Sequence, residues 1–202
     1  MLEILKIPNV DNDNFQRLCQ AYIDLLSYWN SIINLVSTKD VDKLLTDLVS
    51  QSTAPLALME VPQGAKMLDI GSGAGIPALP LKFARQDLQV TLLEPRRQKS
   101  LFLKRVVQEL NLADVEVVRD RIEFAGARPE WRGVFDLITT RGTGSASKLL
   151  PFIEPLMRPG GAFWAFKGMA GRRELREIQG FGKYRARLLE LEKNLSLLVV
   201  DF

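Results

Sequence analysis

The sequence predicts an α/β fold with a mostly parallel sheet, an N-terminal helical cap and an antiparallel C-terminal hairpin. Three observations carry this prediction. Residues 1–60 show helical periodicity, whereas after Pro62 short apolar runs alternate with longer helical patterns. That alternation is typical of parallel strands joined by helices. Near the end, two strand-like runs flank Lys193-Asn194, which indicates a hairpin. We therefore expect a cap over 1–60 and the main domain over 61–202, packed as one compact unit.

The composition is that of a globular protein. The chain has 202 residues, of which 47% are apolar and 25% charged, enough for one domain with a substantial core. No stretch approaches the roughly 20 apolar residues that span a bilayer, and no basic segment followed by an apolar one marks the N-terminus. We expect a monomer in the cytoplasm, with no membrane contact.

The residue types present restrict the chemistry. The chain has no histidine and one cysteine, Cys19, so the usual zinc sites and the Ser-His and Cys-His pairs are unavailable. We expect no metal, and any acid-base work would fall to carboxylates, lysine or tyrosine. The net charge of +3 permits a polyanionic partner without requiring one.

Two helices are predicted ahead of the sheet. Apolar residues recur every three or four positions from Asp11 to Ile33, which indicates one long amphipathic helix. Aspartates at its start suit an N-terminus. A second helix is expected from about Asp40 to Met59, with Pro55 bending or interrupting it.

The remaining elements follow in a regular order. Strands are predicted at 66–70, 89–94, 115–118, 134–139 and 161–166. Helices are predicted at 76–85, 97–110, 145–157 and near 170–179. The closing hairpin comprises "YRARLLELE" and "LSLLVV".

The stretch "DIGSGAGIP" carries the first functional signal. Gly71 and Gly73 allow a tight turn and close approach to a ligand, and Gly75 lets the next helix start near the strand. Glu94 ends the second predicted strand, where a carboxylate can accept hydrogen bonds from ribose hydroxyls. Together they favour an adenosine-containing ligand over an ordinary strand-to-helix connection.

Two ligands fit this pattern, a dinucleotide and S-adenosylmethionine. A dinucleotide fold normally continues with more parallel strands or a substrate domain, whereas this chain ends in an antiparallel hairpin. Asp69 directly before the turn also favours the methyl donor, which has an ammonium and a carboxylate in place of phosphates. We therefore favour a methyltransferase.

The methyl acceptor is constrained by elimination. Carbon methylation of pyrimidines needs a cysteine nucleophile, and Cys19 lies on the apolar face of the first helix. The Asn/Asp-Pro-Pro-aromatic turn that handles exocyclic amines is replaced by "ITTRGTGSAS". A ring nitrogen such as guanine N7 carries no proton to remove, so alignment and water exclusion suffice.

An ordered set of motifs resembles a known family. These motifs are "YWNSIINLVS", "MLDIGSGAGIPALPL", "TLLEPRRQKSLFLKRVVQELNL", "VVRDRIEFA", "FDLITTRG" and "GGAFWAFKG". They resemble the RsmG (GidB) methyltransferases, which methylate N7 of one guanine in bacterial 16S ribosomal RNA. The resemblance implies a Rossmann-like fold, S-adenosylmethionine as cofactor, and 16S ribosomal RNA or the small ribosomal subunit as partner.

The resemblance implies donor contacts in three places. They lie at Gly71 and Ile76, at Ile122 and Glu123, and at Arg141. The residues themselves add Gly73 and Glu94. Arg141 and Lys167, at the ends of the fourth and fifth predicted strands, are candidates for positioning the reactants, with a structural ion pair as the alternative for each.

Substrate recognition is less constrained. Arg96 and Arg97, and Arg172, Arg173 and Arg176, belong to two basic clusters that are candidates for RNA phosphates, against the alternative of solvated helix faces. Family members commonly carry His-x-x-Asp-Ser where this chain has "DLVSQST" at 47–53. Two alternatives therefore stay open: a binding protein for RNA or cofactor without turnover, and a methyltransferase of another RNA or a small molecule.

Overall fold

The computed structural model describes residues 11–36 and 41–202. Helix α1 (Asn12–Asn30) begins where the Asp11 side chain accepts a 3.2 Å hydrogen bond from the Asn14 amide. It ends three residues before the predicted Ile33, because the Asn30 side chain accepts hydrogen bonds from the amides of Leu35 and Val36 and turns the chain. The apolar face of α1 is buried and includes Cys19. Burial raises the pKa of its thiol to about 12. Cys19 is therefore a core residue.

Helix α2 (Val41–Thr53) is shorter than the predicted second helix, whose first residue, Asp40, lies outside the described residues. It gives way to a 3-10 turn, η1 (Ala54–Ala57). Pro55 lies in that turn and disfavours helical geometry in the residue before it, so the predicted interruption at Pro55 is confirmed.

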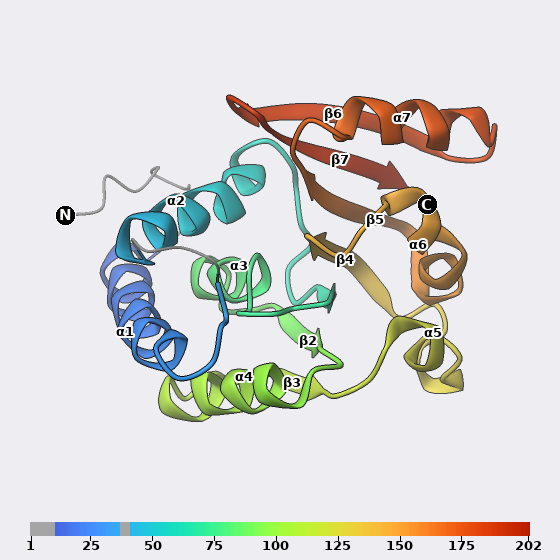
Figure 1. Ribbon diagram of the computed structural model, residues 1–202. Coiled ribbons are helices and arrows are strands. Elements are labelled where there is room, and N and C mark those ends of the chain that lie inside the picture. The colour runs from blue at the N-terminus through green and yellow to red at the C-terminus, as the bar shows by residue number, and fades with distance from the viewer. Residues whose placement is uncertain (1–10, 37–40) are drawn as a thin grey trace.

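Seven strands form one sheet in the order β3-β2-β1-β4-β5-β7-β6 (Figure 1). Strands β1 to β5 pair with one another in parallel, whereas β7 runs antiparallel to both β5 and β6. The α/β fold class with a C-terminal antiparallel hairpin is thus confirmed. The strands are β1 (Lys66–Ile70), β2 (Gln89–Leu93), β3 (Val115–Val118), β4 (Phe135–Arg141), β5 (Met157–Lys167), β6 (Arg185–Glu192) and β7 (Leu195–Asp201).

Helices cover both faces of the sheet. The core on one face joins the sheet to α1, α2, α3 (Ala78–Ala84) and α4 (Arg97–Glu109). The core on the other joins it to α5 (Ile122–Ala125), α6 (Ala146–Ile153) and α7 (Gly171–Gly180). Adjacent residues of β5 face opposite cores, Phe163 the second and Trp164 the first. This alternation follows from the period of two along a strand.

Several element bounds differ from the predictions. β4 continues to Arg141 instead of ending at residue 139, which makes this arginine the last residue of the strand. β5 begins at Met157 instead of residue 161, because a register shift between Phe135 and Leu137 lets Met157 pair ahead of the two glycines. α6 ends at Ile153, followed by a 3-10 turn, η3 (Glu154–Leu156). Helix α5 was not predicted, since four residues are too short for periodicity to show.

No helix in the described part of the chain is long and apolar enough to cross a membrane.

Candidate functional site

The glycine turn follows β1 at the carboxyl edge of the sheet. The amides of Gly71 and Ser72 donate to the Leu93 carbonyl over 2.8 and 3.1 Å, so the turn is joined to the end of β2. Gly71 has φ +70°, and a Cβ placed on it would lie 2.1 Å from Cγ2 of Thr143. The turn therefore requires glycine here both for its backbone conformation and for its approach to the segment after β4.

Glu94 holds this turn from the end of β2. One carboxylate oxygen accepts a 2.8 Å hydrogen bond from the Gly73 amide, and the other accepts one of the same length from the Arg96 amide. The side chain is buried. Each carboxylate oxygen can accept a further hydrogen bond, so this arrangement leaves capacity for a hydroxyl. The sequence predicted Glu94 as a ligand contact, but not that it fixes the glycine turn.

Helix α1 reaches the same turn. Tyr22 is completely buried, and its hydroxyl donates a 2.7 Å hydrogen bond to the Ala74 carbonyl. Burial raises the pKa of this phenol, so the hydroxyl stays a neutral donor. Its ring meets that of Phe83 edge-on at 5.7 Å. The sequence predicted the apolar face of this helix, but no sequence pattern indicated the hydrogen bond.

Asp69 lies beneath the turn. It is 1% exposed, and its Oδ1 accepts a 2.7 Å hydrogen bond from the Thr139 hydroxyl on β4. Oδ2 is buried with no hydrogen-bond partner among the described residues. Burial raises the pKa of this carboxyl to about 6, although the bond from Thr139 opposes the shift.

Arg141 projects from the end of β4 and is held by a neutral partner. Its Nη2 donates a 2.8 Å hydrogen bond to Oε1 of Gln51 on α2. Its guanidinium carbon lies 5.9 Å from the ring centroid of Phe166. Nη1 is buried and has no hydrogen-bond partner within residues 11–36 and 41–202. Desolvation lowers the pKa of this guanidinium, while Glu192 opposes the shift.

Lys167, at the end of β5, is part of a buried ion pair. Its Nζ lies 3.0 Å from Oε2 of Glu174 on α7 and donates to the Gly144 carbonyl. The same Glu174 oxygen accepts a 2.7 Å hydrogen bond from the Ala146 amide at the start of α6. The pair thereby joins α7 to the loop after β4. The structure thus gives Lys167 the structural contact that the sequence left open as an alternative.

A cavity of about 480 Å³ opens at this edge of the sheet. Residues from the N-terminal helical region, the glycine turn, the end of β2 and the end of β4 form its walls. Its lining comprises Leu35, Val36, Leu48, Gly71, Ser72, Gly73, Ala74, Ile76, Glu94, Pro95, Arg96, Lys99, Arg141, Gly142 and Thr143.

This cavity brings together most of the predicted donor-binding residues. Gly71, Gly73, Ile76, Glu94 and Arg141 all line it. The other two, Ile122 and Glu123, lie at the start of α5, where Ile122 is buried in the core and Glu123 is exposed. They are not part of the lining formed by the described residues.

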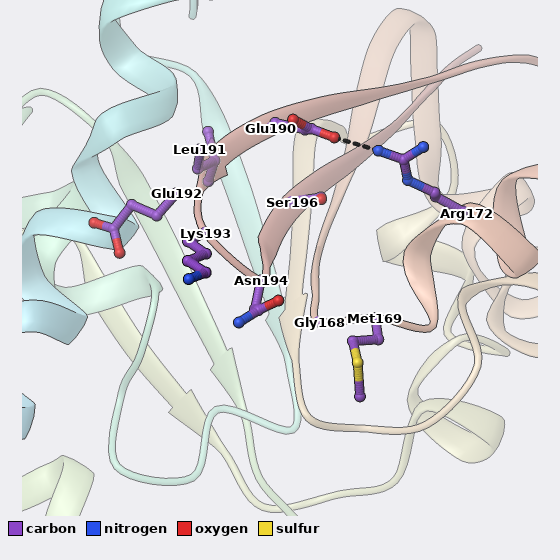
Figure 2. A pocket seen from close by; sticks show the side chains of 9 residues that line it. All are labelled: Gly168, Met169, Arg172, Glu190, Leu191, Glu192, Lys193, Asn194 and Ser196. Atoms are coloured by element: carbon purple, nitrogen blue, oxygen red, sulfur yellow. Dashed lines mark hydrogen bonds and ion pairs between the residues drawn. The ribbon is translucent and has the colours of Figure 1, made fainter.

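A second cavity, of about 630 Å³, lies between the β6–β7 turn and the connection from β5 to α7 (Figure 2). Met169 and Arg172 line one side of it, and Lys193 and Asn194 line the other. Arg172 pairs with Glu190 at 2.5 Å, whereas the Glu192 carboxylate points away from that pair (Figure 2). Glu192 instead accepts a 2.9 Å hydrogen bond from Nε2 of Gln51.

The predicted RNA-binding arginines differ in their surroundings. Arg96 and Arg97 are exposed at the start of α4, and Arg96 lines the first cavity. On α7, Arg172 pairs with Glu190, and Arg173 lies 3.5 Å from Glu177. Arg176 is exposed on the same helix. The α4 pair therefore lies beside the glycine turn, while carboxylates partly compensate the α7 cluster.

Comparison with known sequences identifies the family of this chain. The family model GidB, described as rRNA small subunit methyltransferase G, matches residues 15–191. The chain is 37% identical over 158 residues to ribosomal RNA small subunit methyltransferase G of Moorella thermoacetica, covering 78% of this chain and 66% of that protein. It is 36% identical over 176 residues to the protein of that name from Lactobacillus delbrueckii subsp. bulgaricus, covering 86% and 72%.

The chain is shorter than these relatives. It spans 66% of the length of the Moorella protein and 64% of the namesake from Desulfitobacterium hafniense, in each case less than two thirds.

Solved structures show the same fold. A SAM dependent methyltransferase from Aquifex aeolicus superposes with a TM-score of 0.62 at 18% identity, covering 74% of this chain and 88% of that one. The ribosomal protein L11 methylase of Lactobacillus delbrueckii subsp. bulgaricus gives 0.61 at 12% identity, covering 77% and 78%. The architecture is therefore the Rossmann-like one found in S-adenosylmethionine-dependent methyltransferases.

Proposed function

The chain belongs to the GidB family, and from this membership we propose that it is an S-adenosylmethionine-dependent methyltransferase of 16S ribosomal RNA in the small ribosomal subunit. We further propose guanine N7 as the acceptor atom, the cytoplasm as the place of action and a monomer as the active form. The observation that carries the proposal is the cavity in which the glycine turn, Glu94 and Arg141 meet.

The residues of this cavity fit the chemistry of the donor. Glu94 has spare acceptor capacity for ribose hydroxyls, and Gly71 lines the cavity, where its backbone can contact a ligand. Ile76, Leu35 and Leu48 offer apolar surface to an adenosyl group. Arg141 carries a buried donor with no partner among the described residues, as expected beside a group that supplies a carboxylate oxygen.

The proposed chemistry needs little from the protein beyond alignment. When bound, S-adenosylmethionine supplies an electrophilic methyl group on a sulfonium centre. Guanine N7 has a lone pair and no proton, so a chain without histidine can serve as the catalyst. Tyr22 and Glu94 fix the glycine turn, and holding two reactants in place can contribute about 7–11 kcal/mol.

The acceptor must be reachable. In paired RNA the N7 edge lies in a deep, narrow major groove that side chains cannot enter. We therefore propose that the target guanine lies in an irregular or loosened region, and that a structured subunit is a better substrate than a short duplex. Arg96, beside the cavity, is positioned to contact the backbone of such a region.

A second candidate is a binding protein without turnover. The observation that favours it is Gln51, which lies in the stretch that departs from the family pattern and contacts Arg141 directly. Such a protein would bind RNA or the donor but transfer no methyl group. A methyltransferase that acts on another RNA or on a small molecule is the remaining alternative.

Labelled methyl transfer separates these functions. The protein is incubated with labelled donor and either purified small subunits or naked 16S RNA, and the modified base is mapped. We expect label at a guanine N7 in at least one substrate, and less with Arg141→Ala. Donor binding without label in either RNA would support the binding protein, and label on a different base would refute guanine N7.

Calorimetry tests the cofactor independently. We expect S-adenosylmethionine to bind, and NAD to give no heat of binding. Absence of donor binding would overturn both methyltransferase readings.

A further inference from the structure

Gln51 connects three elements that are distant in sequence. Its amide oxygen accepts a 2.8 Å hydrogen bond from Arg141 at the end of β4, and its amide nitrogen donates a 2.9 Å hydrogen bond to Glu192 at the end of β6. Gln51 lies on α2, so one side chain joins the N-terminal helices, the parallel sheet and the hairpin. An amide suits this place because it offers an acceptor and a donor at once.

The order of the three side chains determines where charge lies. Glu192 is separated from Arg141 by the neutral amide, so the two charged groups influence each other without direct pairing. Arg141 is thereby held on one side by Gln51 and on another by the ring of Phe166, while its charge has no adjacent carboxylate among the described residues. A carboxylate in place of Gln51 would pair with the guanidinium and cancel that charge.

Arg141 also has unused hydrogen-bonding capacity. Nη1 is buried with no partner in the described part of the chain, and a buried charged donor left unpaired costs free energy. The same side chain lines the cavity of about 480 Å³. An oxyanion bound there would satisfy the guanidinium.

We propose that Gln51 is a positioning residue: it orients Arg141 through a neutral contact and keeps the guanidinium uncompensated for an oxyanion ligand. This inference rests on the proposed function for the ligand, which is either the carboxylate of the methyl donor or a phosphate of the RNA. In both cases Gln51 acts through Arg141 and touches neither reactant.

Two nucleosides distinguish the sources of the oxyanion. S-adenosylhomocysteine carries an amino-acid carboxylate, and 5′-methylthioadenosine lacks it. If the donor carboxylate is the ligand, Gln51→Ala lowers affinity for S-adenosylhomocysteine about tenfold, the size expected for a charged hydrogen bond, and leaves that for 5′-methylthioadenosine unchanged. If an RNA phosphate is the ligand, both affinities stay constant and KM for small subunits rises with kcat unchanged.

Gln20→Ala is the matched control. Gln20 makes an exposed side-chain hydrogen bond of 2.9 Å to Asp24 on α1 and does not line the cavity. It should alter neither nucleoside affinity nor KM. If Gln51→Ala behaves like Gln20→Ala in all these measurements, the proposal is wrong.

A charge exchange separates positioning from a structural role. The double variant Gln51→Glu/Glu192→Gln preserves the net charge and the number of hydrogen-bond donors and acceptors among Arg141, residue 51 and residue 192. It differs in that a carboxylate now contacts Arg141. We expect stability equal to or above that of the wild type, because the guanidinium gains a carboxylate partner, while oxyanion affinity, or KM for small subunits, worsens about tenfold. Wild-type affinity and KM in this variant would overturn the proposal, because the place of the charge would then be irrelevant.

Failure of the proposed function looks different. If the wild-type protein transfers no methyl group, that function fails, while the ratio of nucleoside affinities and the affinity for small subunits still test the role of Gln51.

Discussion

The Thr139 hydroxyl on β4 donates a 2.7 Å hydrogen bond to only one carboxylate oxygen of Asp69 on the neighbouring strand β1. The second oxygen is buried without a partner among the described residues. Burial consequently raises the pKa of Asp69 from 3.8 to about 6, which makes this side chain a pH-dependent cost to the fold directly beneath the glycine turn.

The sign of the pH dependence follows from that shift. The folded state holds the proton more tightly than the unfolded state, so stability attributable to Asp69 is present below pH 3.8 and is lost as pH rises through about 6. We expect the wild type to lose up to about 3 kcal/mol relative to Asp69→Asn across this interval. Urea unfolding at pH 4, 5, 6 and 7 measures the difference. If the free energy of unfolding varies with pH in the same way for both proteins, the raised pKa does not belong to Asp69.

Gly71→Ala should abolish donor binding. The new Cβ would lie 2.1 Å from Cγ2 of Thr143, on a backbone of φ +70°. Gly64→Ala is the control, because Gly64 has φ +68° but open space around it, and should cost only about 1–2 kcal/mol of stability. Calorimetry with S-adenosylmethionine measures the loss.

Removing the colliding methyl should restore part of that binding. Thr143→Ser deletes Cγ2, so Gly71→Ala/Thr143→Ser should bind donor better than Gly71→Ala alone. Donor affinity equal to wild type in Gly71→Ala itself would show that the turn does not form the binding site.

Glu174→Gln should destabilise the protein by about 3–5 kcal/mol, because it leaves the Lys167 ammonium buried without its countercharge. Lys167→Met/Glu174→Gln should lose less than this single variant. Glu190→Gln breaks the exposed pair with Arg172 and should change stability by about 1 kcal/mol or less. Denaturant unfolding measures all three. Equal losses of unfolding free energy for Glu174→Gln and Glu190→Gln would show that burial of the Lys167–Glu174 pair does not increase its contribution to stability.

Arg96→Gln and Arg97→Gln should each weaken RNA binding. Each should also reduce the slope of log affinity against log salt concentration by about one. Both arginines are exposed at the start of α4, and Arg96 lines the cavity. Arg105 lies further along the same helix, where it pairs with Glu109, so Arg105→Gln serves as the control. Binding to small subunits at several salt concentrations gives the slopes. Slopes that match the wild type would remove this surface from the RNA interface.

The sequence predicted the parts of the fold that depend on short-range patterns. Strand β1, the glycine turn and Glu94 are recognisable because each signal lies within a few residues of a strand end. Contacts across long sequence separations were not predictable. Tyr22 and Ala74 are 52 residues apart, and Gln51 and Glu192 are 141 apart. Periodicity places such side chains on a face, but it carries no information on which distant atom they meet.

The arrangement of the last three strands has a consequence for folding. β7 lies between β5 and β6, although it follows both in the chain. In any partly folded state without β7, that edge of β5 is therefore unpaired, and an unpaired strand edge is a surface on which chains aggregate. The turn at Asn194, with φ +69°, inserts β7 and leaves β6 as the outer strand. Arginines and glutamates along β6 then discourage edge-to-edge pairing with other chains. The edge of β5 is covered once this hairpin has closed.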